Sequence, residues 1–320
     1  MASKSKESRK PRSISPGQIE TMRYIIIIPA YNEAEFLPRT IEAITQQELL
    51  PQELIIVNDG STDATASVID EFAERFPWIK PVHSYEDKGY AGGAKIIQAF
   101  YRGYEAIQSD DYDFLVKIDA DLYLEPDYFQ RISEHFATKP KLGLVGGMLL
   151  TEKNGKWVYE NISDRDHVKG AYKAWRKPAF DDMGGLKHTI GWDTLDEILL
   201  QYYGWEVLVD ESLPVKHYRP LGTKTGLVRV RVRIGYSFFR MRYGFWISLI
   251  SAAKTAFRNE PYLLSGLAVM WGFVEAWWRG DAYAVNEAEG RYIRRFRLKR
   301  MLGKLSGLGP LPSPSTKQLD

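Results

Sequence analysis

Strand-like and helix-like segments alternate along the first 120 residues, and this alternation constrains the chain more than any other feature of its sequence. Residues 24–28 are Tyr followed by four Ile, and residues 54–57 are Leu-Ile-Ile-Val. Continuous apolar runs of this kind are typical of strands buried on both faces of a parallel sheet. A third strand is expected near residues 81–85 and a fourth over residues 114–118, where apolar residues alternate. The sequence therefore predicts an α/β fold whose parallel sheet is covered on both faces.

The segments between these strands have the spacing of amphipathic helices. Leu37, Ile41 and Ile44 would lie on one face of the first helix. The second helix is expected to begin with Ser61 or Thr62 as its cap. In a sheet of this kind, ligands bind beyond the carboxyl ends of the strands. The turns that follow the strands are therefore the place to look for a site.

The fourth strand ends in two closely spaced carboxylates, Asp119 and Asp121. Side chains two residues apart on extended backbone point the same way. Two neighbouring carboxylates are costly unless positive charge lies between them, and a hydrated divalent cation carrying a substrate diphosphate meets that need. The alternative is a solvated acidic turn. The two site-like turns that precede this one favour the cation site.

The turns after the second and third strands offer different chemistry. Asp59 follows a buried strand directly and can present its carboxylate to ribose hydroxyls or a base N–H, or it can be an Asx-turn residue that only shapes the loop. Gly89, Gly92 and Gly93 allow close approach of backbone to a ligand, and Lys95 adds positive charge near the start of a helix. Both features suit phosphate. The alternative is glycines that only end a turn, since the cluster is neither a Walker loop nor a G-x-G-x-x-G fingerprint.

Three segments, in this order and spacing, resemble glycosyltransferase family 2 on a GT-A fold: Ile28–Glu33, Val57–Asp63 and Asp119–Asp121. The resemblance runs from about Tyr24 to His217. It implies that the first two turns bind the nucleotide of an activated sugar, and that the Asp-x-Asp binds ribose and a divalent cation, Mg²⁺ or Mn²⁺. By resemblance Asp121 is the metal ligand, and the residues on the nucleotide-sugar side are Pro29, Tyr31, Glu33, Asp59, Lys95 and Asp119.

The same resemblance implies a general base in the second half of the catalytic domain. Family members usually have Glu-Asp eleven to twelve residues before a glycine, and Asp193 stands 11 residues before Gly204 (204 − 193 = 11), although Trp192 replaces the Glu. Asp193 is therefore the candidate that takes the proton of an acceptor hydroxyl. The alternative is that Asp193 caps a helix, with Asp196 or Glu197 completing a capping-box-like start.

A late segment, residues 214–220, adds a histidine and an arginine. A lone histidine such as His217 is commonly a hydrogen-bonded structural residue. In several GT-A enzymes a late histidine completes the metal site, so His217 is also a candidate metal ligand. Arg219 is a candidate for contact with the diphosphate.

Beyond Leu221 the composition changes. Basic and apolar residues interleave over 229–244, and two apolar stretches follow at 245–257 and 262–278. Neither stretch meets the roughly 20-residue requirement for a transmembrane helix. Their tryptophans fit helices that pack on the enzyme or lie in a membrane interface. The basic run at 291–300 is then either a site for anionic lipid headgroups or a solvated helix face.

These features divide the chain into four parts. Residues 23–220 are predicted to form the GT-A catalytic domain and residues 221–304 a helical, basic and apolar extension. Residues 1–22 and 305–320 have the composition of disordered tails, and the first contains no apolar stretch long enough for a signal peptide. The chain has no cysteine, which excludes disulfides and thiolate sites, and its formal charge of +2 gives no argument for nucleic acid as a partner.

The resemblance therefore predicts a metal-dependent inverting glycosyltransferase. It would move a sugar from a nucleotide-diphospho sugar to a hydroxyl of a saccharide or lipid-linked acceptor, in envelope polysaccharide or glycolipid synthesis. We expect it in the cytoplasm, peripheral on the inner face of the plasma membrane. One alternative is a sugar-phosphate nucleotidyltransferase, which normally has a glycine-rich Arg/Lys loop in place of Pro29–Tyr31. The other is a catalytically silent, membrane-associated scaffold of the same fold.

Overall fold

The computed structural model describes residues 22–84, 93–159, 165–219, 227–258 and 260–305. Residues 1–21 and 306–320 of the predicted tails, the glycines Gly89 and Gly92, and residues 220–226 at the expected domain boundary lie outside these ranges, whereas Met22 and Leu305 lie within them. The elements before residue 140 are β1 (Tyr24–Ala30), α1 (Leu37–Thr45), β2 (Glu53–Asp59), α2 (Thr65–Arg75), β3 (Ile79–Ser84), α3 (Gly93–Glu105), β4 (Phe114–Ile118), β5 (Leu122–Leu124) and α4 (Tyr128–Thr138).

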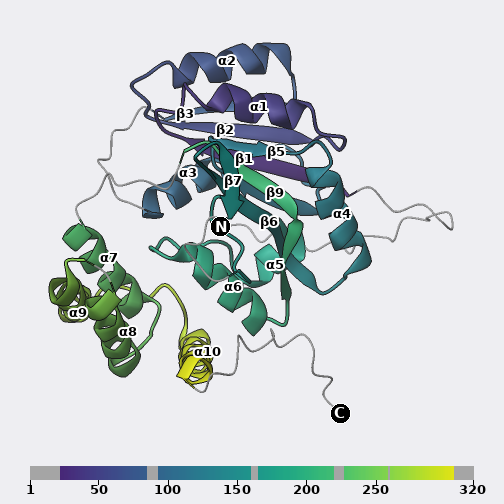
Figure 1. The fold of residues 1–320 in the computed structure, drawn as a ribbon. Coiled ribbons are helices and arrows are strands. Elements are labelled where there is room, and N and C mark those ends of the chain that lie inside the picture. The colour runs from purple at the N-terminus through teal and green to yellow at the C-terminus, as the bar shows by residue number, and fades with distance from the viewer. Residues whose placement is uncertain (1–21, 85–92, 160–164, 220–226, 259, 306–320) are drawn as a thin grey trace.

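The second half of the sheet and the C-terminal helices complete the chain (Figure 1). The elements up to residue 217 are β6 (Leu142–Lys153), β7 (Lys156–Tyr159), β8 (Tyr172–Arg176), α5 (Lys177–Asp182), α6 (Trp192–Tyr202) and β9 (Glu206–His217). Four helices follow, namely α7 (Leu227–Arg240), α8 (Phe245–Arg258), α9 (Tyr262–Arg279) and α10 (Glu287–Leu305).

The described strands form one mixed sheet in the order β3-β2-β1-β4-β8-β6-β9-β5, and β7 pairs with β6. The first four strands in this order are parallel, as the alternation of strands and helices predicts. β8 is antiparallel to both β4 and β6, and β5 is antiparallel to β9. The predicted α/β fold is confirmed, and the parallel half of the sheet brings the turns after β1, β2 and β4 to one edge.

Burial explains why these segments form strands and helices. The four isoleucines of β1 are fully buried, and so are Leu37, Ile41 and Ile44 of α1, which confirms the predicted helix face. One prediction about α2 is wrong, because the helix begins at Thr65 and neither Ser61 nor Thr62 caps it. Their polar groups bind the neighbouring loop instead, as described below.

The C-terminal helices α7, α8 and α9 gather in a group apart from the sheet, while α10 lies beside α6 (Figure 1). Two glycines allow α7 and α9 to meet backbone to backbone. A Cβ atom on Gly235 would lie 2.0 Å from the carbonyl oxygen of Val269, and one on Gly272 would lie 2.0 Å from that of Val232. Among the described helices, none is both long and apolar enough to cross a membrane.

Candidate active site

The turns after β1 and β2 are held together by hydrogen bonds between their loops. The backbone N–H of Asn32 donates to Ser61 Oγ (3.0 Å), and that of Thr62 donates to Asn32 Oδ1 (2.8 Å). The backbone N–H of Glu33 donates to Thr65 Oγ1 (2.8 Å). Because β1 and β2 are adjacent parallel strands, the two turns form one continuous rim at the edge of the sheet.

Three residues predicted to face the nucleotide lie on or near this rim. Pro29 is the second-to-last residue of β1, where it pairs with Val57 of β2. The side chain of Tyr31 follows and is 53% exposed. Lys95, in the first turn of α3, places its Nζ 5.9 Å from the centre of the Tyr31 ring. An exposed aromatic face beside a positive charge is suited to a base and a phosphate, respectively.

Asp59 lies at the end of β2, where its carboxylate forms an ion pair with Arg102 of α3. The loop-shaping role considered for Asp59 belongs to Asn58, whose Oδ1 accepts a hydrogen bond from the backbone N–H of Ser61 (3.0 Å). Asp59 is therefore held against α3 at the same edge as the rim. Its contact with a ribose or base remains a prediction.

Asp119 and Asp121 lie outside the strands. β4 ends at Ile118 and a turn separates it from β5, so strand geometry does not fix the direction of the two side chains as the sequence led us to expect. Each carboxylate has a different partner: Asp119 pairs with the buried Lys117, and Asp121 with His217. Burial raises the pKa of Asp119, and the charge of Asp121 adds to this effect, while Lys117 opposes it.

Strand pairing explains how His217 reaches Asp121 from 96 residues away in sequence. β5 and β9 are antiparallel, and Leu122, the residue after Asp121, is paired with His217. The His217 Nε2 atom lies 3.2 Å from Asp121 Oδ2. The expected proximity of these two candidate ligands is thus present in the fold.

Arg219 joins the first turn to this pair. Its guanidinium donates two hydrogen bonds to the Glu33 carboxylate, at 3.2 and 2.6 Å, and its Nε lies 4.0 Å from Asp121 Oδ2. Burial raises the pKa of Glu33; Arg219 lowers it, while Asp121 and Asp119 raise it further. In this structure Arg219 therefore contacts a carboxylate of the site, and its contact with a diphosphate remains a prediction.

The donor set at this edge suits a divalent cation that is shared with a substrate. Within the described parts of the chain, no group of three or more His, Cys, Asp or Glu side chains is arranged to hold a metal ion by itself. Mg²⁺ is commonly bound through one or two carboxylates plus substrate phosphates, and does not need a complete protein cage. Asp121 and His217 fit such a partial set. Burial is the main cause of the raised pKa of Glu33 and of Asp119, and the neighbouring Asp121 carboxylate adds to both, a repulsion that a cation would offset.

Asp193 lies in the first turn of α6 but does not cap it. The N-cap residue is Gly191, whose φ of 76° is in the left-handed region that glycine adopts readily, and no side chain caps the helix. The capping alternative for Asp193 is therefore wrong. Asp196 and Glu197 do not complete a capping box either, because their carboxylates turn inward to Lys173.

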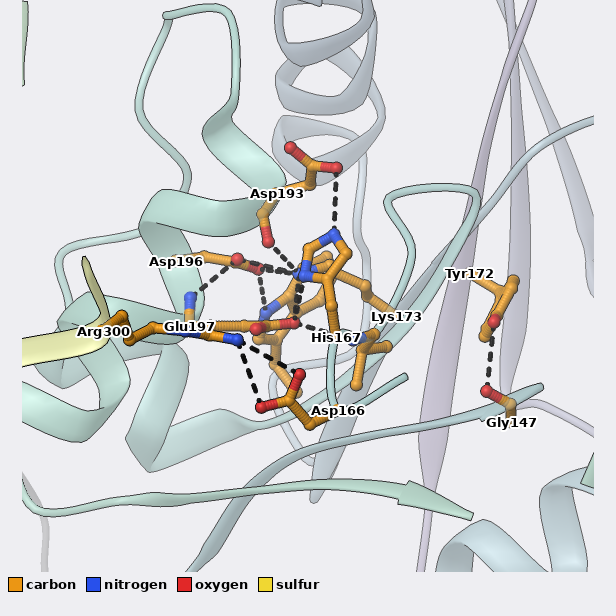
Figure 2. A network of polar contacts seen from close by, with 11 residues as sticks. Gly147, Asp166, His167, Tyr172, Lys173, Asp193, Asp196, Glu197 and Arg300 are labelled. Carbon is orange, nitrogen blue, oxygen red and sulfur yellow. Dashed lines mark hydrogen bonds and ion pairs between the residues drawn. The ribbon is translucent and has the colours of Figure 1, made fainter. Parts of the chain in front are cut away.

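A residue that the sequence did not suggest, His167, contacts Asp193 (Figure 2). Its Nε2 lies 3.4 Å from Asp193 Oδ2, and its Nδ1 lies 3.0 Å from Glu197 Oε1. Burial lowers the pKa of His167, but the two carboxylates outweigh it and raise the pKa to about 9. For the Asp193 carboxylate, burial acts in the opposite direction and raises the pKa. The positive charges of His167 and Lys173 outweigh this effect and lower the pKa to about 2. At neutral pH the two residues are an ion pair.

Lys173 of β8 belongs to the same network (Figure 2). Its fully buried ammonium donates to Asp196 Oδ1 (2.8 Å) and to the backbone oxygen of Asp193 (2.5 Å). Burial lowers the pKa of Lys173, but the carboxylates of Asp196, Glu197 and Asp193 outweigh it, so the lysine stays charged. Because Asp196 also accepts a hydrogen bond from the Trp175 indole (3.0 Å), the start of α6 is fixed to the sheet.

One lysine and one glycine connect the two carboxylate groups of the site. Lys117 Nζ donates one hydrogen bond to the Asp119 carboxylate. It donates another to the carbonyl oxygen of Gly170 (2.7 Å). Gly170 in turn packs on Asp193, since a Cβ atom added to it would lie 3.0 Å from Asp193 Cβ. The Asp119 turn and the start of α6 at Asp193 are therefore neighbours in the fold, connected through Lys117 and Gly170.

Comparison with known proteins agrees with this architecture. The profile of Glycosyl transferase family 2 matches residues 25–188, just over half of the 320 residues. A mannosyltransferase from Pyrobaculum calidifontis, solved with GDP-Man and Mn²⁺, superimposes with a TM-score of 0.53 at 17% identity, over 96% of this chain and 81% of that one. The sheet order and these matches together identify the fold as GT-A, the fold of many glycosyltransferases. The chain belongs to Glycosyl transferase family 2.

Curated relatives match the N-terminal part of the chain. An uncharacterized glycosyltransferase of Nostoc sp. is 33% identical over 138 residues, which are 43% of this chain and 40% of that protein. A poly-beta-1,6-N-acetyl-D-glucosamine synthase of Staphylococcus epidermidis is 31% identical over 130 residues, 41% of this chain and 29% of that protein. The chain thus spans less than half the length of these relatives. The predicted glycosyltransferase activity is supported, and the nucleotidyltransferase alternative is not.

Proposed function

We propose that this protein is a metal-dependent, inverting glycosyltransferase that uses a nucleotide-diphospho sugar and transfers the sugar to a hydroxyl of a saccharide or lipid-linked acceptor. The observation that supports this most is the connection of two carboxylate centres through Lys117 and Gly170 at one edge of the sheet. One centre, Asp121 with His217, suits the diphosphate end of a donor. The other, Asp193 with His167, suits the acceptor.

In the reaction, the acceptor oxygen forms a bond to the anomeric carbon while the bond from that carbon to the diphosphate oxygen breaks. The acceptor proton passes to the Asp193 carboxylate, a step that contributes roughly 10²–10⁴-fold. Asp121 and His217 would hold a divalent cation, which would supply positive charge to the diphosphate. The rim residues Tyr31 and Lys95 hold the nucleotide, so that orientation supplies much of the rate.

His167 positions Asp193 and also limits its basicity. A carboxylate with a pKa of about 2 is a weak base, and the neighbouring imidazolium opposes proton uptake by it. Loss of the His167 proton would remove this opposition, and the neutral ring would keep one N–H donor for one of its two carboxylate partners. Transfer should therefore become faster as the pH rises toward the pKa of His167, about 9.

We also propose that residues 221–304 attach the catalytic domain, residues 23–220, to the inner face of the plasma membrane from the cytoplasmic side, as in envelope polysaccharide or glycolipid synthesis. Exposed apolar side chains on α9 support this. Leu264, Leu267, Trp271, Val274 and Trp278 recur at intervals of three and four residues, which places them on one face of the helix. An exposed apolar face of this kind marks an interaction surface.

Two substitutions test the proposed activity. Asp121→Ala and Asp193→Ala should each abolish transfer, but only Asp121→Ala should also abolish the Mn²⁺- or Mg²⁺-dependent rise in Tm that a nucleotide sugar produces. Saturation at about 100 times Kd adds roughly 2.7 kcal/mol of stability, which is readily measured. Equal loss of donor binding in both variants would show that Asp193 is not the base. Absence of transfer and of donor binding in the unsubstituted protein would favour the silent scaffold.

A further inference from the structure

A cavity of about 490 Å³ lies among α7, α8, α9 and the segment that leads to α10. Its wall is mostly aromatic and includes Phe239, Phe273, Trp277 and Tyr283. Two arginines, Arg242 and Arg294, complete it. An apolar cavity with a few charged groups at one place is the usual form of a site for a small amphiphilic molecule.

Both arginines are held in place while their charges remain uncompensated. Arg242 Nε donates to the Val285 carbonyl (3.0 Å), and its guanidinium lies 3.6 Å from the centre of the Tyr283 ring. Arg294 Nη1 donates to the Arg242 carbonyl (2.8 Å). Among the described residues, neither guanidinium has a carboxylate partner. Two fixed guanidinium groups without counter-charges are suited to a phosphate.

The cavity belongs to the apolar surface of the helical group. Val274 and Trp277 of α9 line it and are also part of the exposed surface, where Trp278 next to them is 85% exposed. A soluble anion would gain little from the aromatic wall, and a neutral apolar ligand would leave two arginines unpaired. An anion attached to an aliphatic chain satisfies both parts of the cavity.

We propose that this cavity binds the phosphate and the adjoining part of an acidic membrane phospholipid, and so selects anionic membrane surfaces, because the phosphate of such a lipid has no cationic headgroup beside it to oppose the two arginines. The inference rests on the proposed membrane attachment of residues 221–304 and names the lipid that this attachment recognises. The phosphate lies against Arg242 and Arg294, and the chain passes along Phe239, Phe273 and Trp277. The exposed stripe of α9 enters the interface beside it, whatever the headgroup.

The test compares binding of the full-length chain to vesicles of phosphatidylcholine alone and to vesicles containing phosphatidylglycerol, by flotation at fixed ionic strength. Arg294→Gln removes one charge from the cavity, and Arg291→Gln is its control, since Arg291 is exposed on α10 and pairs with Glu287 at 3.0 Å. A residue near an anionic surface contributes about 1 kcal/mol per charge, or roughly fivefold. Arg294→Gln should lower the preference for phosphatidylglycerol by about fivefold or more, and Arg291→Gln by less.

A second pair of variants fills the cavity without changing the charge. Val274→Trp obstructs it, and Leu267→Trp adds the same side chain seven residues earlier on the same exposed face (274 − 267 = 7), outside the cavity wall. Both should bind phosphatidylcholine vesicles at least as well as the unsubstituted chain. Only Val274→Trp should lose the preference for phosphatidylglycerol.

Three results would overturn the proposal. The first two are equal losses of the phosphatidylglycerol preference in Arg294→Gln and Arg291→Gln, and an unchanged preference in Val274→Trp. The third is release of the protein from phosphatidylglycerol vesicles by inorganic phosphate at constant ionic strength, which would assign the cavity to a soluble phosphate. Donor binding with Mn²⁺, measured by Tm in the same four variants, should be unchanged. Failure of the lipid site is thereby distinguishable from failure of the proposed transfer activity.

Discussion

The Nε2 atom of His167 lies 3.4 Å from the Asp193 carboxylate, 26 residues further along the chain (193 − 167 = 26). The other ring nitrogen of His167 contacts Glu197, which lies one helical turn after Asp193 on α6. A single imidazolium therefore bridges two carboxylates of the same helix. This contact gives the proposed base a fixed orientation and a pH-dependent neighbour.

The first prediction concerns the pH dependence of transfer. In the unsubstituted protein, kcat/KM should rise as the pH increases through about 9, because His167 then loses the charge that opposes proton uptake by Asp193. His167→Gln keeps a hydrogen-bond donor and has no charge to lose, so its profile should be flat over the same range. The measurement is release of nucleoside diphosphate from the donor between pH 6 and pH 10. A rising limb of equal size in His167→Gln would assign the titration to another group.

The second prediction concerns stability. The pKa of His167 is raised from 6.5 to about 9, so its contribution is fully present below pH 6.5 and is lost as the pH rises through 9. The pKa of Asp193 is lowered from 3.8 to about 2, so its contribution is present above pH 3.8 and is lost as the pH falls through 2. The difference in unfolding free energy between the unsubstituted chain and His167→Gln should thus be largest between pH 3.8 and pH 6.5, at ~3 kcal/mol, and should shrink by pH 9.

Urea unfolding at pH 5.5 and pH 9 measures this difference. His83, which lies on β3 and contacts Asp70 at 2.9 Å, provides the control substitution His83→Gln. The control should show a smaller difference at pH 5.5, because its partner Asp70 is more than half exposed. A difference for His167→Gln that is constant with pH would mean that packing, and not charge, accounts for its role.

The third prediction concerns the buried Lys117, which neutralises Asp119 and bonds to Gly170. Lys117→Met should destabilise the protein by about 3 kcal/mol. This value is at the low end of the range for breaking a buried ion pair, because the Asp119 side chain is 33% exposed and water can solvate part of its charge. Lys80→Met, on β3, where the half-buried lysine donates a surface hydrogen bond to the Pro77 carbonyl (2.8 Å), should change stability by less than about 0.5 kcal/mol. Urea midpoints compare the two. Equal effects would show that Lys117 acts through its aliphatic stem alone.

The fourth prediction concerns Gly170. A methyl group there would lie 3.0 Å from Asp193 Cβ and 3.1 Å from Trp192 Cζ2, so Asp193 must shift by a few tenths of an ångström. Gly170→Ala should lower kcat by about tenfold, less than the ~10²-fold that a 1 Å misplacement can cost. Metal-dependent donor binding should not change. Loss of donor binding with kcat unaffected would place Gly170 on the nucleotide side instead.

The architecture could be predicted from the sequence because its signals are local. The run of isoleucines in β1 predicts a buried strand, and the spacing of Leu37, Ile41 and Ile44 predicts a buried helix face. All of these residues are fully buried in the structure. The three turns meet because parallel strands end at one edge of the sheet.

The contacts of the site could not be predicted in the same way. Nothing in the sequence connects His167 to Asp193 or Arg102 to Asp59, because each pair is made by tertiary packing between separate elements. The orientation of Asp119 and Asp121 depended on where β4 stops, and the strand ends at Ile118. The cap of α2 was misplaced because Ser61 bonds across to Asn32 in place of its own helix.

The backbone contact between α7 and α9 at Gly235 and Gly272 has a mechanical consequence. Two helices that touch at this depth have no layer of side chains between them that could slide or repack. The contact therefore fixes the exposed apolar face of α9 relative to α7. If the proposed membrane attachment holds, the helical group meets a lipid surface already folded, without the entropic penalty of ordering on arrival.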